Sequence, residues 1–280
     1  MHRIDQRQWM VCDAHIIKSV IGKNMKQNEW DSVAGKYLTA WEQKLLDTWA
    51  ADAFGFYAAQ LGHTARLHGL AQNRCSQRWA IEVGERLYES AHAHEVRYVD
   101  VGDFTVLPFE SDSLDVLILP HTLDDHPEPH AALREAYRVL RPEGKMIILG
   151  CNPMSLWGAS ARFARLRGQS WWAYRHQSLH VGRLKDWLQL LNCDITQGKY
   201  GCYAPYVRSD QWLRRWQWME NAGDRWWGMA GAVYAIMAVK RVHAPTLVGL
   251  INEKKNNRSW IKQPALNTVN HHKTEHQIKQ

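Results

Sequence analysis

Polar side chains that could do chemistry directly follow three apolar segments of the sequence. Asp103 follows VRYVDVG, His121 follows LDVLILP, and Cys151 follows KMIILG. If these apolar segments are parallel strands, their carboxyl ends meet at one edge of a sheet, and ligands of open α/β sheets bind at that edge. The spacing therefore predicts one crevice lined by the residues at these strand ends, including Pro120.

The segment HTLDDHPEPH could also suggest a metal site. Five residues with metal-ligating side chains occur within ten positions: His121, Asp124, Asp125, His126 and His130. Their spacing matches no tetrahedral motif, and two prolines interrupt the segment. We therefore interpret it as a loop at the rim of the crevice and predict no metal.

Helical and strand-like patterns alternate along the chain and predict the frame that holds these side chains. Helices are expected at residues 36–54, 65–72, 85–93, 128–140 and 183–191, and strands at residues 55–62, 78–84, 96–103, 114–120, 145–150, 193–203 and 231–242. Near-continuous apolar strands that alternate with helices are typical of a parallel sheet covered on both faces. The expected fold is α/β, doubly wound, with a mainly parallel seven-stranded sheet in which the last strand is antiparallel.

Composition narrows the class of protein further. The net charge of +7 is uneven, because residues 25–150 are acidic and residues 151–250 are basic, so the charge by itself does not indicate nucleic-acid binding. The five cysteines are scattered without a C-x-x-C pair, which favours reduced thiols over disulfides or a zinc motif. The longest apolar run, Gly228 to Val239, is too short to span a bilayer. We expect a cytoplasmic protein with no membrane span.

The patterning also predicts three segments of different character. Residues 1–35 are expected to be an N-terminal extension that is partly ordered at best, and both Met1 and Met25 could be the start of translation. Residues 36–250 hold the alternating elements, with insertions near 157–175 and 203–227 that would cap a pocket. Residues 251–280, rich in Asn, Lys, His and Gln, are expected to be a disordered basic tail.

The stretch from Gly102 to Leu149 resembles the second half of the class I S-adenosylmethionine-dependent methyltransferases of the type 11 branch. The matching pieces, in chain order, are Gly102-Asp103, Leu107-Pro108-Phe109, Ser113-Leu114-Asp115, Glu135, Arg138-Val139-Leu140 and Pro142-Glu143-Gly144. The later NPMSLWG is similar to a little-characterised bacterial subgroup of that branch. The resemblance implies a Rossmann-like fold, S-adenosylmethionine as cofactor and methyl transfer to an unidentified acceptor.

The resemblance also implies where the cofactor binds. Asp103 would accept a hydrogen bond from the adenine amine, and Phe104 would cover the ring. Glu82 or Glu85, at the end of the second strand, would take the ribose hydroxyls. Pro120, at the end of the fourth strand, would line the same crevice.

The loop after the first strand departs from the family pattern of Glu/Asp-x-Gly-x-Gly-x-Gly. The aligned residues read QLGHTAR, so Gln60 stands in place of the acid and Gly62 is the remaining glycine. A side chain where the backbone must approach a ligand closely is a steric problem. We keep Gln60 and Gly62 as expected cofactor contacts. The alternative to an enzyme is a catalytically silent, methyltransferase-like binding or regulatory protein. The sequence feature that discriminates between these two functions is the loop at residues 60–66.

The acceptor side of the pocket is less clearly marked. If methyl transfer needs a general base, His121 and Tyr174 are the candidates. The insertions hold SWWAYRH (residues 170–176) and an Arg- and Trp-rich segment (residues 210–227), in which Trp212, Leu213, Trp216 and Met219 would share one helical face. We interpret the two segments either as a cap packed on the sheet or as a pocket for an anionic or planar substrate. Nucleic acid is among those substrates, although no nucleic-acid-binding motif supports it.

Overall fold

The computed structural model describes residues 30, 32–83, 96–166, 178–206, 209–216 and 218–242. All of them belong to one unit that ends at Val242. The predicted tail at residues 251–280, the chain before Trp30 and the helix expected at residues 85–93 lie outside the described residues.

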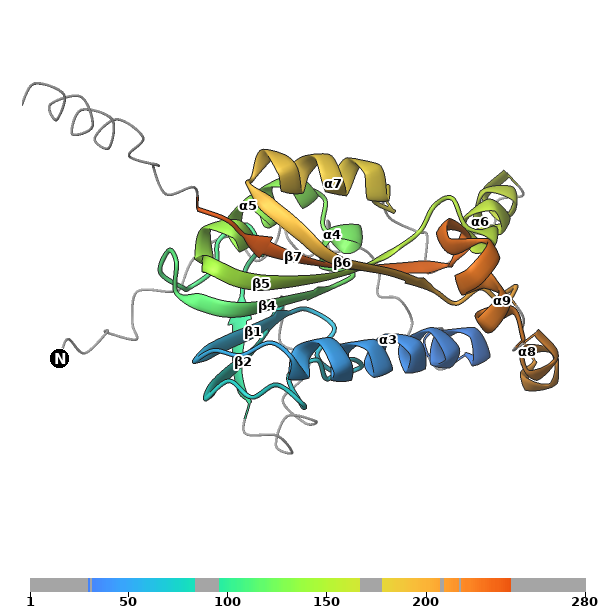
Figure 1. The fold of residues 1–280 in the computed structure, drawn as a ribbon, viewed down its shortest axis with the longest axis horizontal. Helices are drawn as coiled ribbons and strands as arrows, with labels where there is room; N and C mark the ends of the chain where they lie inside the picture. Colours follow the sequence, from blue (N-terminus) through green and yellow to red (C-terminus); the bar gives the residue numbers. More distant parts are fainter. Residues whose placement is uncertain are drawn as a thin grey trace, which may run out of the picture. The chain divides into compact units, whose positions relative to one another are not determined.

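Seven strands form one sheet in the order β3-β2-β1-β4-β5-β7-β6 (Figure 1). They are β1 (Tyr57–Leu61), β2 (Gln77–Val83), β3 (Arg97–Val101), β4 (Leu114–Pro120), β5 (Leu140–Cys151), β6 (Cys193–Gly201) and β7 (Val233–Lys240). Strands β1 to β5 pair in parallel, whereas β7 is antiparallel to both β5 and β6. This arrangement confirms the predicted sheet and its antiparallel last strand.

Burial on both faces explains why the central strands are almost continuously apolar. Every residue of β7 is buried, and so is every residue of β4 except the half-buried Asp115. The last residue of β7, Lys240, is a buried cation. Its ammonium donates to the carbonyl oxygens of Tyr137 and Leu140 at 2.9 and 2.8 Å and pairs with Asp112 at 2.6 Å. Hydrogen bonding of this kind is what makes a buried charge tolerable.

Helices cover both faces of the sheet, as predicted (Figure 1). They are α3 (Val33–Ala51) on one face, and α5 (Pro129–Val139) and α7 (Val181–Leu190) on the other. Helix α3 begins after Ser32, whose hydroxyl accepts a hydrogen bond from the Gly35 N–H at 3.1 Å. Its apolar stripe, which includes Leu46, packs on β1, β4 and β5. Leu133 of α5 and Leu184 of α7 lie in the core on the opposite face.

The connection from β1 to β2 consists of turns, so the helix predicted at residues 65–72 is wrong. Two buried side-chain amides bind this loop instead. Gln60 donates to the Leu67 carbonyl at 2.7 Å and accepts from the Gly69 N–H at 3.0 Å. Asn73 donates to the carbonyls of Ala50 and Ala53, at the end of α3. Backbone N–H and C=O groups that would pair with one another in a helix pair with these side-chain amides instead. This pairing favours turns over a helix.

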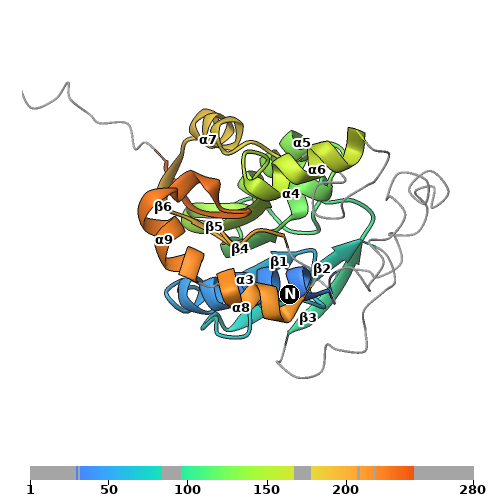
Figure 2. The same ribbon diagram turned by 90° about the vertical axis from the view of Figure 1, so that its right-hand side faces the viewer.

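Short helices gather at the end of the sheet where β5 finishes and β7 begins (Figure 2). They are α6 (Leu156–Leu166), α8 (Asp210–Trp216), α9 (Trp218–Trp226) and the 3-10 turn η3 (Gly228–Ala230). Asn152 ties them to the sheet, because its amide donates to the carbonyls of Met229 and Gly231. Both predicted insertions fall in this region, and residues 167–175 of the first lie outside the described residues.

Candidate functional site

The carboxyl ends of β1, β2, β3 and β4 converge on one place. Gly62 follows β1 with a φ of +80°, a conformation that glycine adopts without strain. A β-carbon on Gly62 would lie 3.5 Å from the ring of Phe104, after β3, and 3.6 Å from the hydroxyl of Thr122, after β4. The Gly62 N–H donates to the Ile81 carbonyl on β2 at 2.7 Å. Gly62 is therefore the point at which these strand ends meet.

Glu82, near the end of β2, holds the β1 loop in place. Its Oε1 accepts from both the N–H and the hydroxyl of Thr64, each at 2.7 Å. Among the described residues, no hydrogen bond reaches its Oε2. Glu82 thus combines a loop contact with an acceptor oxygen left over for a ligand.

Asp103 follows β3 and caps a turn. Its Oδ1 accepts from the Thr105 N–H at 2.9 Å and bonds His126 Nε2 at 2.7 Å. Burial acts to raise the pKa of Asp103, but the hydrogen bonds from Thr105 and His126 outweigh it and hold the pKa below its usual range. About half of the side chain is exposed, and its Oδ2 has no hydrogen bond among the described residues. The turn-capping role and the predicted ligand role use different oxygens.

Gln60 occupies the position of the family's first acid but faces inward. It is 2% exposed, and its amide bonds the backbone at Gly62, Leu67 and Gly69. Both kinds of polar atom on its side chain are therefore engaged within the loop. Pro120 is likewise buried at the end of β4, where it pairs with Leu149 of β5.

His121 lies in the core and not on an exposed rim, which corrects the rim-loop interpretation. It precedes the short helix α4 (Thr122–Asp125), is 3% exposed and has a left-handed φ of 53°. Its Nε2 lies 2.7 Å from Oε1 of Glu42, and its Nδ1 lies 3.4 Å from Oδ2 of Asp124 and 3.7 Å from the sulfur of Cys151. Burial disfavours the imidazolium, but Glu42, Cys151 and Asp124 together hold the pKa of His121 well above its usual range.

The rest of the histidine- and aspartate-rich segment points elsewhere. Asp125 pairs with His63 at 2.8 Å, and His126 pairs with Asp103. The five predicted ligand candidates therefore do not gather around one point. His121 and Asp124 form their cluster with partners from other parts of the chain.

Glu42 is the important site residue that the sequence reasoning missed. It lies on α3 and is fully buried, and no described residue bonds its Oε2. A signal was available, because Glu42 is four residues after Leu38 and three before Leu45, both on the apolar stripe. A carboxylate on the buried face of a helix requires a partner, and the partner is His121.

A ring cluster adjoins this network. Trp30, just before α3, lies 5.9 Å from the rings of both His63 and His121. The Arg66 guanidinium stacks over Trp30 at 4.7 Å. Arg66, which stands where the family has its last glycine, therefore packs against Trp30.

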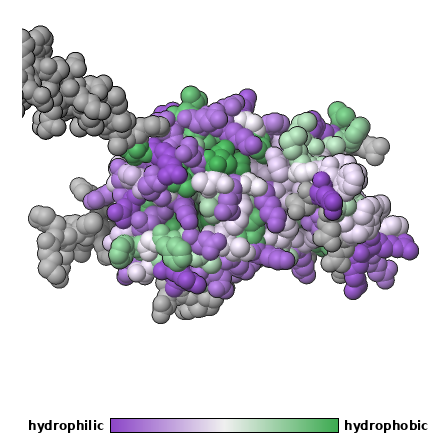
Figure 3. Space-filling model, viewed as in Figure 1, coloured by the Kyte–Doolittle hydropathy of each residue, from purple (hydrophilic) through white to green (hydrophobic). Residues whose placement is uncertain are grey.

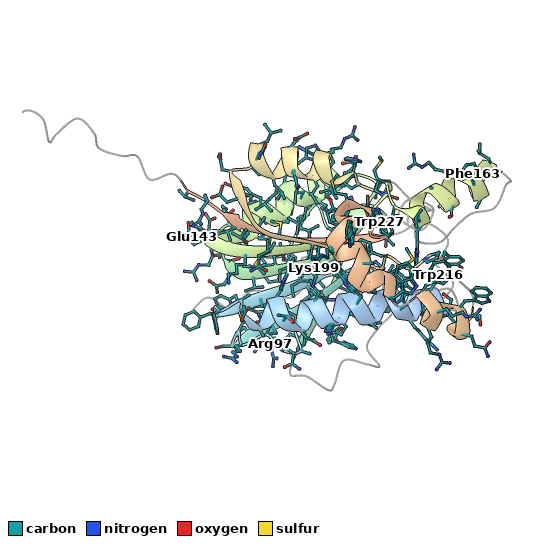
Figure 4. All side chains as sticks on the ribbon, turned by 45° about the vertical axis from the view of Figure 1, so that its right-hand side comes forward. Arg97, Glu143, Phe163, Lys199, Trp216 and Trp227 are labelled. Atoms are coloured by element: carbon teal, nitrogen blue, oxygen red, sulfur yellow. The ribbon has the colours of Figure 1, made fainter. Side chains whose placement is uncertain are left out.

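The predicted acceptor side is described only in part, because Tyr174 and the SWWAYRH segment lie outside the described residues. The single helical face expected for residues 212–219 is wrong, because the chain forms two helices there and Trp212 is exposed while Met219 is buried. Apolar side chains of α6 lie on the surface at this end (Figure 3). Figure 4 shows Phe163, Trp216 and Trp227 on the same end of the molecule.

Comparison with known proteins shows which proteins this chain resembles. Residues 60–148 match the family model described as a methyltransferase domain. The chain is 33% identical over 153 residues to YafS, an uncharacterized protein of Escherichia coli, covering 55% of this chain and 59% of YafS. It is also 33% identical over 69 residues to the ubiquinone/menaquinone biosynthesis C-methyltransferase UbiE of a Ruegeria species, covering 25% of this chain and 28% of that protein. These alignments span less than two thirds of either relative.

Solved structures support the fold. An S-adenosylmethionine-dependent methyltransferase of Thermotoga maritima superimposes with a TM-score of 0.52 at 17% identity, covering 81% of this chain and 99% of that one. A second, from Mesorhizobium loti, gives a TM-score of 0.50 at 14% identity, covering 75% and 99%. At such identities the likeness concerns the fold, which is the Rossmann-like methyltransferase fold.

Proposed function

We propose, on the premise that this chain belongs to the class I S-adenosylmethionine-dependent methyltransferases, that it binds S-adenosylmethionine and transfers its methyl group to an acceptor. One observation carries the proposal. At the strand ends around Gly62, two carboxylates each keep one oxygen that no described residue bonds, Oε2 of Glu82 and Oδ2 of Asp103.

These residues fit the adenosine half of the cofactor. Ribose hydroxyls and the adenine amine are donors, and carboxylate oxygens are acceptors. Glu82 would take the ribose and Asp103 the amine, with the Phe104 ring against the base. Gly62 leaves open the space that a β-carbon would enter, 3.5 Å from Phe104.

The cofactor, when bound, supplies a methyl group on a sulfonium, which is displaced in line by the acceptor. The chain's contribution is then to align donor and acceptor and to exclude water. His121 and Tyr174 remain the candidates for a general base. For His121, a base role has to compete with its buried contacts to Glu42 and Asp124.

A catalytically silent scaffold is the second candidate function, and the β1 loop favours it. Gln60 is engaged within the loop, and Thr64 occupies one oxygen of Glu82. A protein of this kind would keep the crevice for binding without methyl transfer.

Titration calorimetry with S-adenosylhomocysteine and S-adenosylmethionine tests the proposal. We expect saturable binding of one ligand per chain, weakened at least tenfold in Glu82→Gln, which loses a charged acceptor. Adenosine alone should retain part of the affinity, because Glu82, Asp103 and Phe104 are proposed to contact the nucleoside. The absence of heat from either cofactor form at about 1 mM, a concentration at which a ligand with micromolar affinity would saturate, would overturn the binding proposal. Binding without methyl transfer to any acceptor tested would favour the silent scaffold.

The cellular setting is also proposed here. None of the described helices is both long and apolar enough to cross a membrane. A cytoplasmic enzyme is in keeping with the scattered, buried thiols of Cys75, Cys151, Cys193 and Cys202, and a bacterial source with the relatives named above. The acceptor remains open between a small molecule and a macromolecule, and nucleic acid has no motif to support it.

A further inference from the structure

Three different metal-ligating atoms lie together where β4 and β5 end. A ring nitrogen of His121, a carboxylate oxygen of Asp124 and the sulfur of Cys151 are all within 4.8 Å of one another. The Nδ1 atom is 3.4 Å from the Asp124 oxygen and 3.7 Å from the Cys151 sulfur. Ligand atoms around a tetrahedral zinc ion are roughly 3.3–3.6 Å apart, given its usual bond lengths. Two of the three ligand-atom distances therefore suit one ion, and the third, between the Asp124 oxygen and the Cys151 sulfur, is at most 4.8 Å.

The hydrogen bond to Glu42 directs the correct ring nitrogen toward this cluster. With Glu42 as the acceptor in their 2.7 Å contact, Nε2 of His121 carries the hydrogen. In the neutral ring, Nδ1 then presents a lone pair to the carboxylate of Asp124. Two acceptors that face each other need a cation between them, either a proton or a metal ion.

Two of the three ligands, His121 and Asp124, are each held by further groups, as in known metal sites. Glu42 fixes the His121 ring, the arrangement found in carboxylate–histidine–zinc triads. Both oxygens of Asp124 accept backbone hydrogen bonds, from Cys151 at 2.7 Å and from Leu179 at 3.0 Å. The cluster is therefore already organised by the fold around it.

The charges at the cluster also favour a cation. Glu42 and Asp124 are both buried, and among the described residues no Lys or Arg side chain pairs with either. Oε2 of Glu42 is fully buried and, in the part of the chain that the structure describes, has no hydrogen-bond partner. A buried carboxylate with an unused oxygen, bonded through its other oxygen to a ligating histidine, is costly unless positive charge lies nearby.

We propose that His121, Asp124 and Cys151 form a zinc site, with Glu42 orienting the histidine and a fourth position open to water or another exogenous ligand. A mixed nitrogen, oxygen and sulfur set in tetrahedral spacing is typical of Zn²⁺. Binding releases two protons to solvent: the Cys151 thiol proton, because the thiolate is the ligand, and the proton that otherwise lies between Nδ1 of His121 and Asp124. The site does not depend on the proposed methyl transfer.

Metal binding by the full-length protein is the first test. Chelator-treated protein is titrated with Zn²⁺ in competition with a chromophoric chelator, and separately with Co²⁺ while the absorption spectrum is recorded. We expect one equivalent of each metal. The cobalt form should show a thiolate-to-metal charge-transfer band and the intense visible bands of a tetrahedral ion.

Variants assign the ligands. Cys151→Ser should abolish the charge-transfer band, and Asp124→Asn should weaken zinc binding at least tenfold. Cys75→Ser, which changes another buried cysteine that lies away from the cluster, should leave both unchanged. The charge-transfer band needs a thiolate, so cobalt held only by histidines elsewhere in the chain would not mimic the expected result.

The wild-type measurements keep the proposal testable even if a variant fails to fold. Absence of stoichiometric zinc binding by the folded wild type would overturn it and leave a proton between His121 and Asp124. A charge-transfer band that persists in folded Cys151→Ser would overturn it as well. Calorimetry with S-adenosylhomocysteine on the metal-free and zinc-loaded protein keeps the two proposals separate, since either ligand can bind when the other does not.

Discussion

Replacement of Asp103 by asparagine separates the two uses of that carboxylate. The turn uses Oδ1, which accepts from the Thr105 N–H, and asparagine retains an oxygen that can accept this bond. The proposed cofactor contact uses Oδ2, where asparagine places an NH₂ group opposite the adenine amine. Loss of a hydrogen bond to a charged acceptor is worth about 1.5–3 kcal/mol, so we expect roughly tenfold to hundredfold weaker S-adenosylhomocysteine binding in Asp103→Asn.

The same substitution should change stability little. Asp103 also pairs with His126 at 2.7 Å, but half of the carboxylate is exposed, so solvent screening limits the pair to below about 1 kcal/mol. A loss of that size corresponds to a fall in melting temperature of less than about 4 °C.

Calorimetry and thermal unfolding on the same preparation check both quantities. Asp194→Asn is the matched control. Asp194 lies on the edge strand β6, at the opposite side of the sheet from β3, and forms an exposed ion pair with Arg241. A lower melting temperature with unchanged ligand affinity would mean that Asp103 serves the turn alone. Equal weakening in Asp103→Asn and Asp194→Asn would point to general electrostatics in place of a specific contact.

Three further expectations concern the frame and its pH response. Lys240→Met should lower the free energy of unfolding by about 2–4 kcal/mol in urea denaturation, because two buried carbonyls lose their donor. Gly201→Ala should lower it by about 1–3 kcal/mol, because the new β-carbon would lie 1.9 Å from the Trp41 ring. Gly198→Ala on the same strand is the control, because its β-carbon would lie 4.0 Å from the nearest atom, the carbonyl oxygen of Ala235. Hydrogen bonds from Arg138 hold the pKa of Glu135 below its usual range, so the stability it contributes is present above its unfolded-state pKa and is lost as the pH falls through the folded value. Melting temperatures measured from neutral to acidic pH should therefore fall less steeply in Glu135→Gln, and an unchanged slope would contradict this assignment.

The sequence determined the sheet because its signals are local. Strands buried on both faces need continuous apolar runs, and those of β4 and β7 are legible without any knowledge of their neighbours. The alternation with amphipathic helices then leaves few arrangements. The polar residues after β1, β3 and β4 could be expected at one crevice, because parallel strands end on the same side.

The tertiary structure decided which polar groups meet and which remain available. Glu42 and His121 are 79 positions apart, and their contact exists because α3 packs across the end of β4. Gln60 stands in the sequence where the family has an acid that contacts the cofactor. Its side chain is buried instead, because its amide pairs with backbone groups of the loop after β1. The sequence proximity of His121, Asp124 and their histidine and aspartate neighbours suggested a single rim loop. The observed cluster instead includes Cys151 from the end of β5. Side-chain chemistry depends on distance in space, and the pairing of β4 with β5 sets that distance.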